Sequence, residues 1–194
     1  MKRTVIILSA GSLATAISPR ANHAMESEIG ELLTRWTVRL AVACYVLRLS
    51  VDVTGWRTPS AKRAVLWLWT AAYGLFLTHV ICAFQFYHEW SHFAAYEHTA
   101  RQTAVAVGID WGGGLYFNYL FISIWMGDVT AWWRLGDAYI ERRKVYWTVQ
   151  AIFAFMIVNA TVVFGPPFWK WVALAVATGL LLIRIVCQRP RVGH

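Results

Sequence analysis

Long stretches of apolar side chains dominate the chain, and short polar segments separate them. A transmembrane helix needs about 20 mostly apolar residues. Five stretches approach that length, at about 33–53, 64–87, 111–133, 145–164 and 168–187. Several of them lack the polar face that a helix of a soluble protein presents to water. The pattern predicts an all-α, polytopic transmembrane bundle of about five spans, formed by a single domain over residues 25–194.

The first predicted span is the most polar, because Arg39, Arg48 and Asp52 interrupt it. Arg39 and Arg48 lie near its two ends, where long side chains can reach the interface. Arg48 and Asp52 are four residues apart and are expected to pair. The second predicted span carries no formal charge, and His79 is its one histidine.

Composition agrees with a membrane protein, since 58% of the residues are hydrophobic and only 14% are charged. The net charge of +8 comes mostly from Lys and Arg in the segments between spans, at 54–63, 134–144 and the C-terminal tail. The 88–110 segment contains one basic residue, Arg101. Basic segments stay in the cytoplasm. We therefore expect an N-out, C-in protein of the cell (inner) membrane, with the lipid bilayer as its partner and no nucleic-acid partner.

Residues 1–24 have the features of a targeting segment. Lys2 and Arg3 precede a short apolar run, and small residues follow near Ala24. This order is typical of a signal peptide that is removed from the mature chain. An alternative is that translation begins at Met25.

Four of the six histidines fall within residues 79–98, around the end of the second predicted span. That position predicts a site on the periplasmic or extracytoplasmic side. His88 and His92 are four residues apart, so on one helix both imidazoles can bind one metal ion. With Glu89 the segment matches HExxH, in which the glutamate acts as general base on metal-bound water.

A third ligand to zinc, iron or copper can come from two places. His98 occupies the position of the third ligand in the longer metzincin pattern, but Ala95 stands where that pattern has a glycine. On an unbroken helix His98 lies about 15 Å from His88, so it is a ligand only if the chain breaks between Phe93 and Glu97. Asp110 is the other candidate, and its competing role is to cap a helix beginning at Trp111.

His79 lies about 13 Å from His88 along a helix and on roughly the opposite face. We expect it to be a neutral core histidine bonded to a neighbouring span, with Asn118 or Tyr119 as partner. A bis-histidine haem is not favoured, because no other predicted span contains a histidine. A single-histidine or His/Met haem stays open, and no CxxCH motif for covalent attachment occurs.

Three functions follow from these observations. The first is a membrane protein that binds a transition metal through His88, His92, His98 and Asp110, for redox chemistry or metal handling. The second is a membrane-embedded zinc hydrolase with Glu89 as base. The third is a non-catalytic subunit of a membrane complex, for which polar, aromatic ends of spans need no metal.

Overall fold

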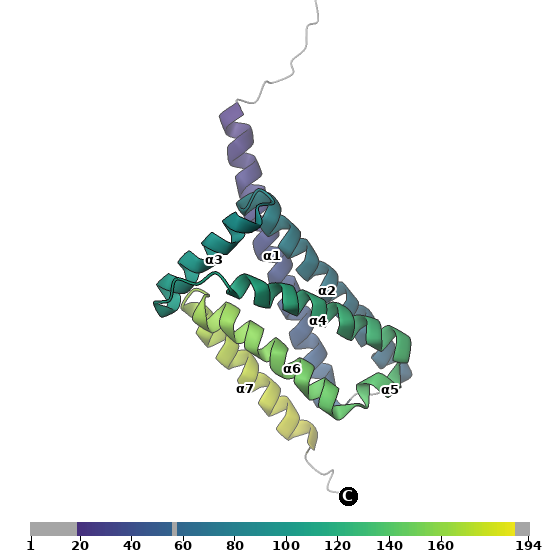
Figure 1. Ribbon diagram of the computed structural model, residues 1–194. Helices are drawn as coiled ribbons and strands as arrows, with labels where there is room; N and C mark the ends of the chain where they lie inside the picture. Colours follow the sequence, from purple (N-terminus) through teal and green to yellow (C-terminus); the bar gives the residue numbers. More distant parts are fainter. Residues whose placement is uncertain (1–18, 56–57, 189–194) are drawn as a thin grey trace, which may run out of the picture.

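Helices make up nearly all of the part of the chain that the computed structural model describes, residues 19–55 and 58–188, and that part contains no strand. The elements in chain order are α1 (Pro19–Thr54), α2 (Pro59–Tyr87), α3 (His92–Val107), α4 (Gly114–Leu135), α5 (Asp137–Ile140), α6 (Arg143–Val158), the π-helical turn η1 (Asn159–Val163) and α7 (Phe168–Gln188). Figure 1 shows this arrangement. The all-α prediction is confirmed.

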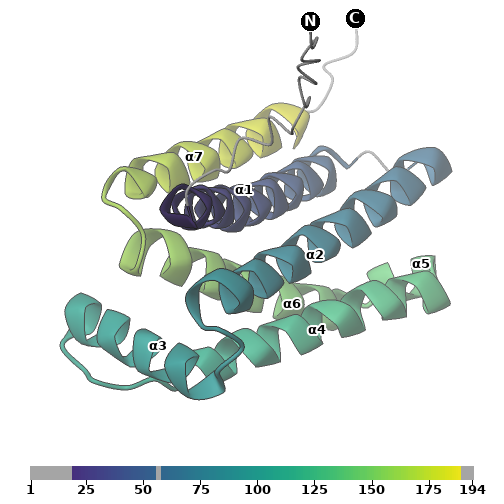
Figure 2. The same ribbon diagram turned by 90° about the horizontal axis from the view of Figure 1, so that it is seen from above.

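The long helices pack side by side. Helix α1 packs against α2 and α7, and α4 packs against α2 and α6. The two short connecting helices lie at opposite ends of this bundle, α3 at one end and α5 at the other (Figures 1 and 2). We refer to these as the α3 end and the α5 end.

Three helical segments in the described part of the chain are long and apolar enough to cross a membrane: Pro59–Tyr87, Arg143–Val163 and Phe168–Cys187. They correspond to three of the five predicted spans. The other two predicted spans also form long helices, α1 and α4, but these helices are not apolar enough to be counted with the three. Arg39, Arg48 and Asp52 interrupt α1, and α4 includes Asn118 and Asp128 among its aromatic residues.

Local sequence signals explain where several helices begin. At the start of α2, the Thr58 hydroxyl accepts a hydrogen bond from the Ala61 amide and Pro59 occupies the first helical position, as expected for a helix N-terminus. Helix α4 begins at Gly114. Its N-cap residue is Gly113, so no side chain caps this helix. Asp110 therefore does not cap a helix beginning at Trp111, which corrects that alternative.

The segment from 88 to 110 is not simply a loop, because it contains the 16-residue helix α3. The Ser91 hydroxyl accepts a hydrogen bond from the Ala94 amide and so caps this helix. The predicted leader, residues 1–24, lies mostly outside the described residues, and its role stays a prediction.

The most tightly packed part of the bundle lies toward the α5 end. Its buried hydrophobic residues come from α1, α2, α4 and α6: Ala41, Tyr45, Val65, Leu66, Trp69, Ala72, Phe121, Trp125, Val129, Trp132, Val149 and Phe153. Trp69 and Phe153 are almost completely buried, with their ring centroids 4.9 Å apart. Aromatic contacts of this kind add to the gain from burial itself.

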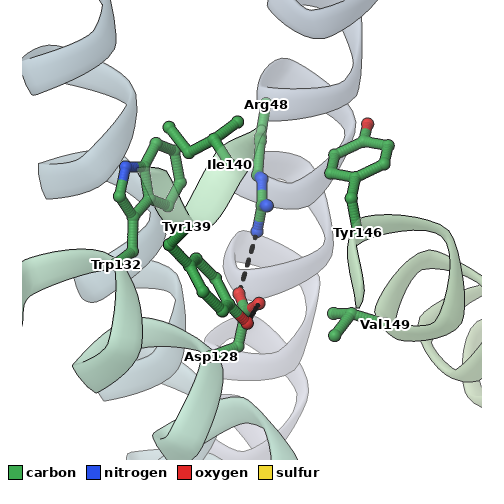
Figure 3. A pocket seen from close by; sticks show the side chains of 7 residues that line it. All are labelled: Arg48, Asp128, Trp132, Tyr139, Ile140, Tyr146 and Val149. Atoms are coloured by element: carbon green, nitrogen blue, oxygen red, sulfur yellow. Dashed lines mark hydrogen bonds and ion pairs between the residues drawn. The ribbon is translucent and has the colours of Figure 1, made fainter. Parts of the chain in front are cut away.

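A buried ion pair joins α1 to α4 within this core (Figure 3). Arg48 Nη1 lies 3.5 Å from Asp128 Oδ2, and both side chains are at most 5% exposed. Asp128 also accepts hydrogen bonds of 2.7 Å from the Trp69 indole N–H and from the Tyr139 hydroxyl. The Arg48 guanidinium lies over the Trp69 and Trp132 rings, 4.0 and 5.0 Å from their centroids. Arg48 is thus held inside the bundle and does not extend to the interface as expected.

Asp52 completes this charged cluster from one turn further along α1. Its carboxylate lies 3.8 Å from Arg48 Nε and accepts a 2.9 Å hydrogen bond from the Tyr146 hydroxyl of α6. The predicted pairing of Arg48 with Asp52 is confirmed. The cluster therefore connects α1, α2, α4, α5 and α6 through polar contacts.

We predict that Asp128→Ala lowers the free energy of unfolding by about 3 kcal/mol, because it leaves the Arg48 charge buried without its main partner. Combining it with Arg48→Met should recover a large part of that loss, since both charges are then gone. Thermal unfolding of the detergent-solubilised protein measures both effects.

The exposed pair Glu31–Arg35 on α1 is the matched control. Glu31→Ala should change stability by less than about 1 kcal/mol, because water already solvates both charges. Equal losses in Glu31→Ala and Asp128→Ala would contradict the structural role given to the buried pair.

Candidate functional site: a cavity at the α3 end

The helices that meet tightly at the α5 end leave a cavity of about 780 Å³ toward the α3 end. Five helical segments border it: Thr34–Tyr45 of α1, Phe76–Tyr87 of α2, His98–Thr103 of α3, Gly114–Trp125 of α4 and Phe153–Thr161 of α6 and η1. Ligand sites typically have volumes of about 300–1,000 Å³ and mostly apolar walls with a few polar groups. The cavity has both properties.

Aromatic rings form the floor of this cavity. Phe121 and Phe153 have ring centroids 4.6 Å apart, and Trp125 lies 4.8 Å from Phe153. Phe76 contacts both Phe121 and Trp125, at 5.2 and 5.4 Å. Because Tyr45 also packs on Phe153 at 5.4 Å, the floor separates the cavity from the Arg48–Asp128 cluster.

The turn between α2 and α3 sets the position of the clustered histidines. Glu89 and Trp90 both have positive φ, 46° and 59°, a conformation uncommon for residues other than glycine. The Trp90 and Ser91 amides donate to the carbonyls of Phe84 and His88, at 3.1 and 2.7 Å. These bonds satisfy the backbone where α2 ends, so the helix stops at Tyr87 and the chain turns back.

A glycine lets α3 lie close to the start of α4. A Cβ atom added to Gly112 would lie only 2.4 Å from the Tyr96 carbonyl oxygen. No larger residue fits there without moving α3. The glycine run at 112–114 thus serves close packing of α3 against α4, which keeps α3 at the border of the cavity.

The turn brings together His88 and His98. Their ring centroids are 5.2 Å apart with the rings nearly perpendicular, and both residues line the cavity. Burial, and secondarily the charge of His98, lower the pKa of His88. His88 therefore stays neutral, with a lone pair on one ring nitrogen, at pH values where an exposed histidine begins to protonate.

His92 takes a different position from the one that HExxH requires. It is the first residue of α3, whereas His88 directly follows the last residue of α2. Its Nδ1 lies 3.1 Å from the Tyr119 hydroxyl, and its ring packs on Tyr116 and Tyr119. The single helix that would place His88 and His92 one turn apart is absent, because α2 ends before the motif is complete.

The remaining predicted site residues are exposed. Glu89 lies in the left-handed turn, and Asp110 lies in the connection between α3 and α4. Within residues 19–55 and 58–188, no group of three or more His, Cys, Asp or Glu side chains is placed to hold a metal ion. The predicted set of His88, His92, His98 and Asp110 is thus brought together only in part, as the His88–His98 pair.

His79 of α2 lies deeper in the cavity wall, about two and a half helical turns before His88. Its Nδ1 is 2.8 Å from the backbone carbonyl oxygen of Thr34 on α1. The partner is thus a backbone group of α1 and not the expected Asn118 or Tyr119 of α4. Because a carbonyl only accepts, Nδ1 carries the hydrogen and Nε2 carries the lone pair.

A second cavity, beside the Arg48–Asp128 cluster (Figure 3), has a volume of only about 10 Å³. That space is of the order of one water molecule. It is too small for a substrate, so the cluster is a structural element of the bundle, and the candidate site is the larger cavity.

Comparison of the chain with protein-family models, curated proteins and solved structures finds no match. Functional assignment therefore rests on the residues of the cavity themselves.

Proposed function

We propose that this chain is an integral membrane protein that holds a hydrophobic small molecule in the cavity at the α3 end. The proposal rests on the cavity, which offers about 780 Å³ of space above an aromatic floor. A space of this size with mostly apolar walls is typical of a ligand site. It therefore supports the proposal of a bound molecule.

The polar groups of the cavity are few and come from several helices. His88 and His98 lie at the α3 end, His79 lies in the wall, and Gln102 of α3 and Asn118 of α4 add amides. A few polar groups among apolar side chains fix the orientation of a bound ligand, and the ligand itself can be largely apolar. The ligand that fits this lining has a large apolar body and a polar end.

To test the proposal, we introduce a bulky side chain into the cavity. Ala83 of α2 lines the cavity, whereas Ala71 of the same helix is exposed on the bundle surface. Ala83→Trp should lower the fraction of protein carrying a bound molecule by about tenfold or more, equivalent to at least about 1.4 kcal/mol. Native mass spectrometry of protein purified from membranes measures that fraction.

Ala71→Trp is the matched control and should retain the bound molecule. A wild-type protein without any bound mass, or equal occupancy in the two tryptophan variants, would overturn the proposal.

We also propose that five helices cross the membrane, α1, α2, α4, α6 with η1, and α7, with the N-terminus outside and the C-terminus in the cytoplasm. Basic residues support this orientation. Lys62 at the start of α2 pairs with Asp137 of α5 at 2.7 Å, so two basic connecting segments lie together at the α5 end. The α3 end contains Arg101, which pairs with Glu97. The cavity then opens on the extracytoplasmic side of the cell membrane.

Cysteine labelling tests this topology. In a background with Cys44, Cys82 and Cys187 replaced by alanine, Glu97→Cys should react with a membrane-impermeant maleimide on intact spheroplasts. Glu141→Cys should react only after lysis, because it follows α5. The reverse pattern, or equal labelling of both variants before lysis, would contradict the orientation.

A second candidate function is metal binding by the His88–His98 pair, and the ring geometry favours it. Two imidazoles that bind one zinc ion at about 2.0–2.1 Å in tetrahedral geometry have ring centres about 5 Å apart. The observed separation is 5.2 Å. The hydrolase with Glu89 as base and the subunit of a larger complex stay predictions.

For this candidate, elemental analysis of the purified protein should find zinc, copper or iron that is lost in both His88→Ala and His98→Ala. His92→Ala should retain the metal, because Tyr116 and Tyr119 hold that ring elsewhere. Loss of metal in His92→Ala with retention in His98→Ala would instead support the HExxH arrangement.

A further inference from the structure

His79 restricts what can occupy the cavity, an inference that rests on the proposed ligand-binding function. Its Nδ1–H donates to the Thr34 carbonyl, and the residue lines the cavity. A plain acyl chain beside it would leave the Nε2 lone pair without a partner, and an unsatisfied buried polar atom is unfavourable. An occupant that presents a metal ion or a hydrogen-bond donor at the level of His79 would satisfy this nitrogen.

The hydrogen bond to Thr34 is compatible with a metal on the other ring nitrogen. A histidine that binds a metal through one ring nitrogen generally donates its other N–H to a backbone carbonyl or a carboxylate, which fixes the tautomer and the ring orientation. His79 has this arrangement. The described residues offer no group of three ligands for a bare ion, so the metal must arrive with ligands of its own.

Helix geometry puts Met156 of α6 at about the depth of His79. Phe76 and Phe153 each contact the same two side chains of α4, Phe121 and Trp125, so these two rings mark one level. His79 follows Phe76 by three residues and Met156 follows Phe153 by three, which places each about 4.5 Å further toward the α3 end. Both residues line the cavity. A histidine and a methionine thus border the space above the floor from two different helices.

We propose that the cavity binds b-type haem, with His79 as axial ligand to the iron and Met156 on the other side of the macrocycle. Histidine and methionine are established axial ligands of haem iron. The aromatic floor suits the apolar macrocycle, and His88, His98 and Gln102 lie at the polar end, where the propionates would lie. Attachment is non-covalent, because the chain has no CxxCH sequence.

The test is the absorption spectrum of the full-length protein, purified from membranes and then titrated with hemin in detergent. The wild type should show a Soret band at about one haem per chain, and dithionite should give the sharp visible bands of a six-coordinate low-spin ferrous haem. His79→Gly should lose most of the bound haem, and added imidazole should restore it. Met156→Leu should keep the haem but become high-spin.

His92→Ala is the control and should have the wild-type spectrum, because His92 packs on tyrosines away from the proposed iron site. The imidazole rescue separates loss of a ligand from loss of the fold. A Soret band of unchanged intensity and spin state in His79→Gly would overturn the proposal.

Absence of haem from the wild type, before and after hemin addition, would also overturn it. If native mass spectrometry then still finds a bound molecule that is lost in Ala83→Trp, the ligand-binding function stands and only the haem assignment falls. A quinol recovered by solvent extraction would be such a result, with its hydroxyl as donor to His79.

Discussion

Arg48 on α1 and Asp128 on α4, 80 residues apart in the sequence, meet inside the bundle. Neither charge is stable there alone, because each would lose its hydration without replacement. The Trp69 indole N–H, the Tyr139 hydroxyl and the faces of the Trp69 and Trp132 rings supply the remaining contacts. These requirements hold α1, α2, α4 and α5 in one arrangement at the α5 end. Toward the α3 end no comparable cluster joins α2 to α6, and the same helices leave a cavity.

The long apolar stretches were sufficient to predict where the long helices end. All five predicted spans end within two residues of the observed helical segments, for instance at Tyr87 for α2, since helix length and apolar content are properties of the local sequence. The pairing of Arg48 with Asp52 was also predictable, because residues four apart share a helix face. The contact of Arg48 with its second partner, Asp128, depends on how α1 and α4 pack. The spacing of residues along one helix does not specify that packing.

The histidine cluster shows where local pattern was insufficient. The HExxH spacing has meaning only on a continuous helix, and nothing at Glu89-Trp90 signals a break, because neither residue is glycine or proline. Both nevertheless adopt positive φ. Because the chain turns back there, the ring beside His88 is that of His98 and not that of His92. His79 was recognised as unusual within an apolar span, but its partner, the Thr34 carbonyl, is a backbone group that no side-chain pattern reveals.

We propose that the space between α2 and α6 belongs to a ligand and is part of the native structure. The most direct test is an experimental structure of the full-length protein purified from membranes without added ligand. We expect density for a bound molecule above the Phe121–Trp125–Phe153 floor, in contact with His79. A bundle in which α2 and α6 close on each other, with His79 packed against protein side chains and no space above the floor, would contradict it.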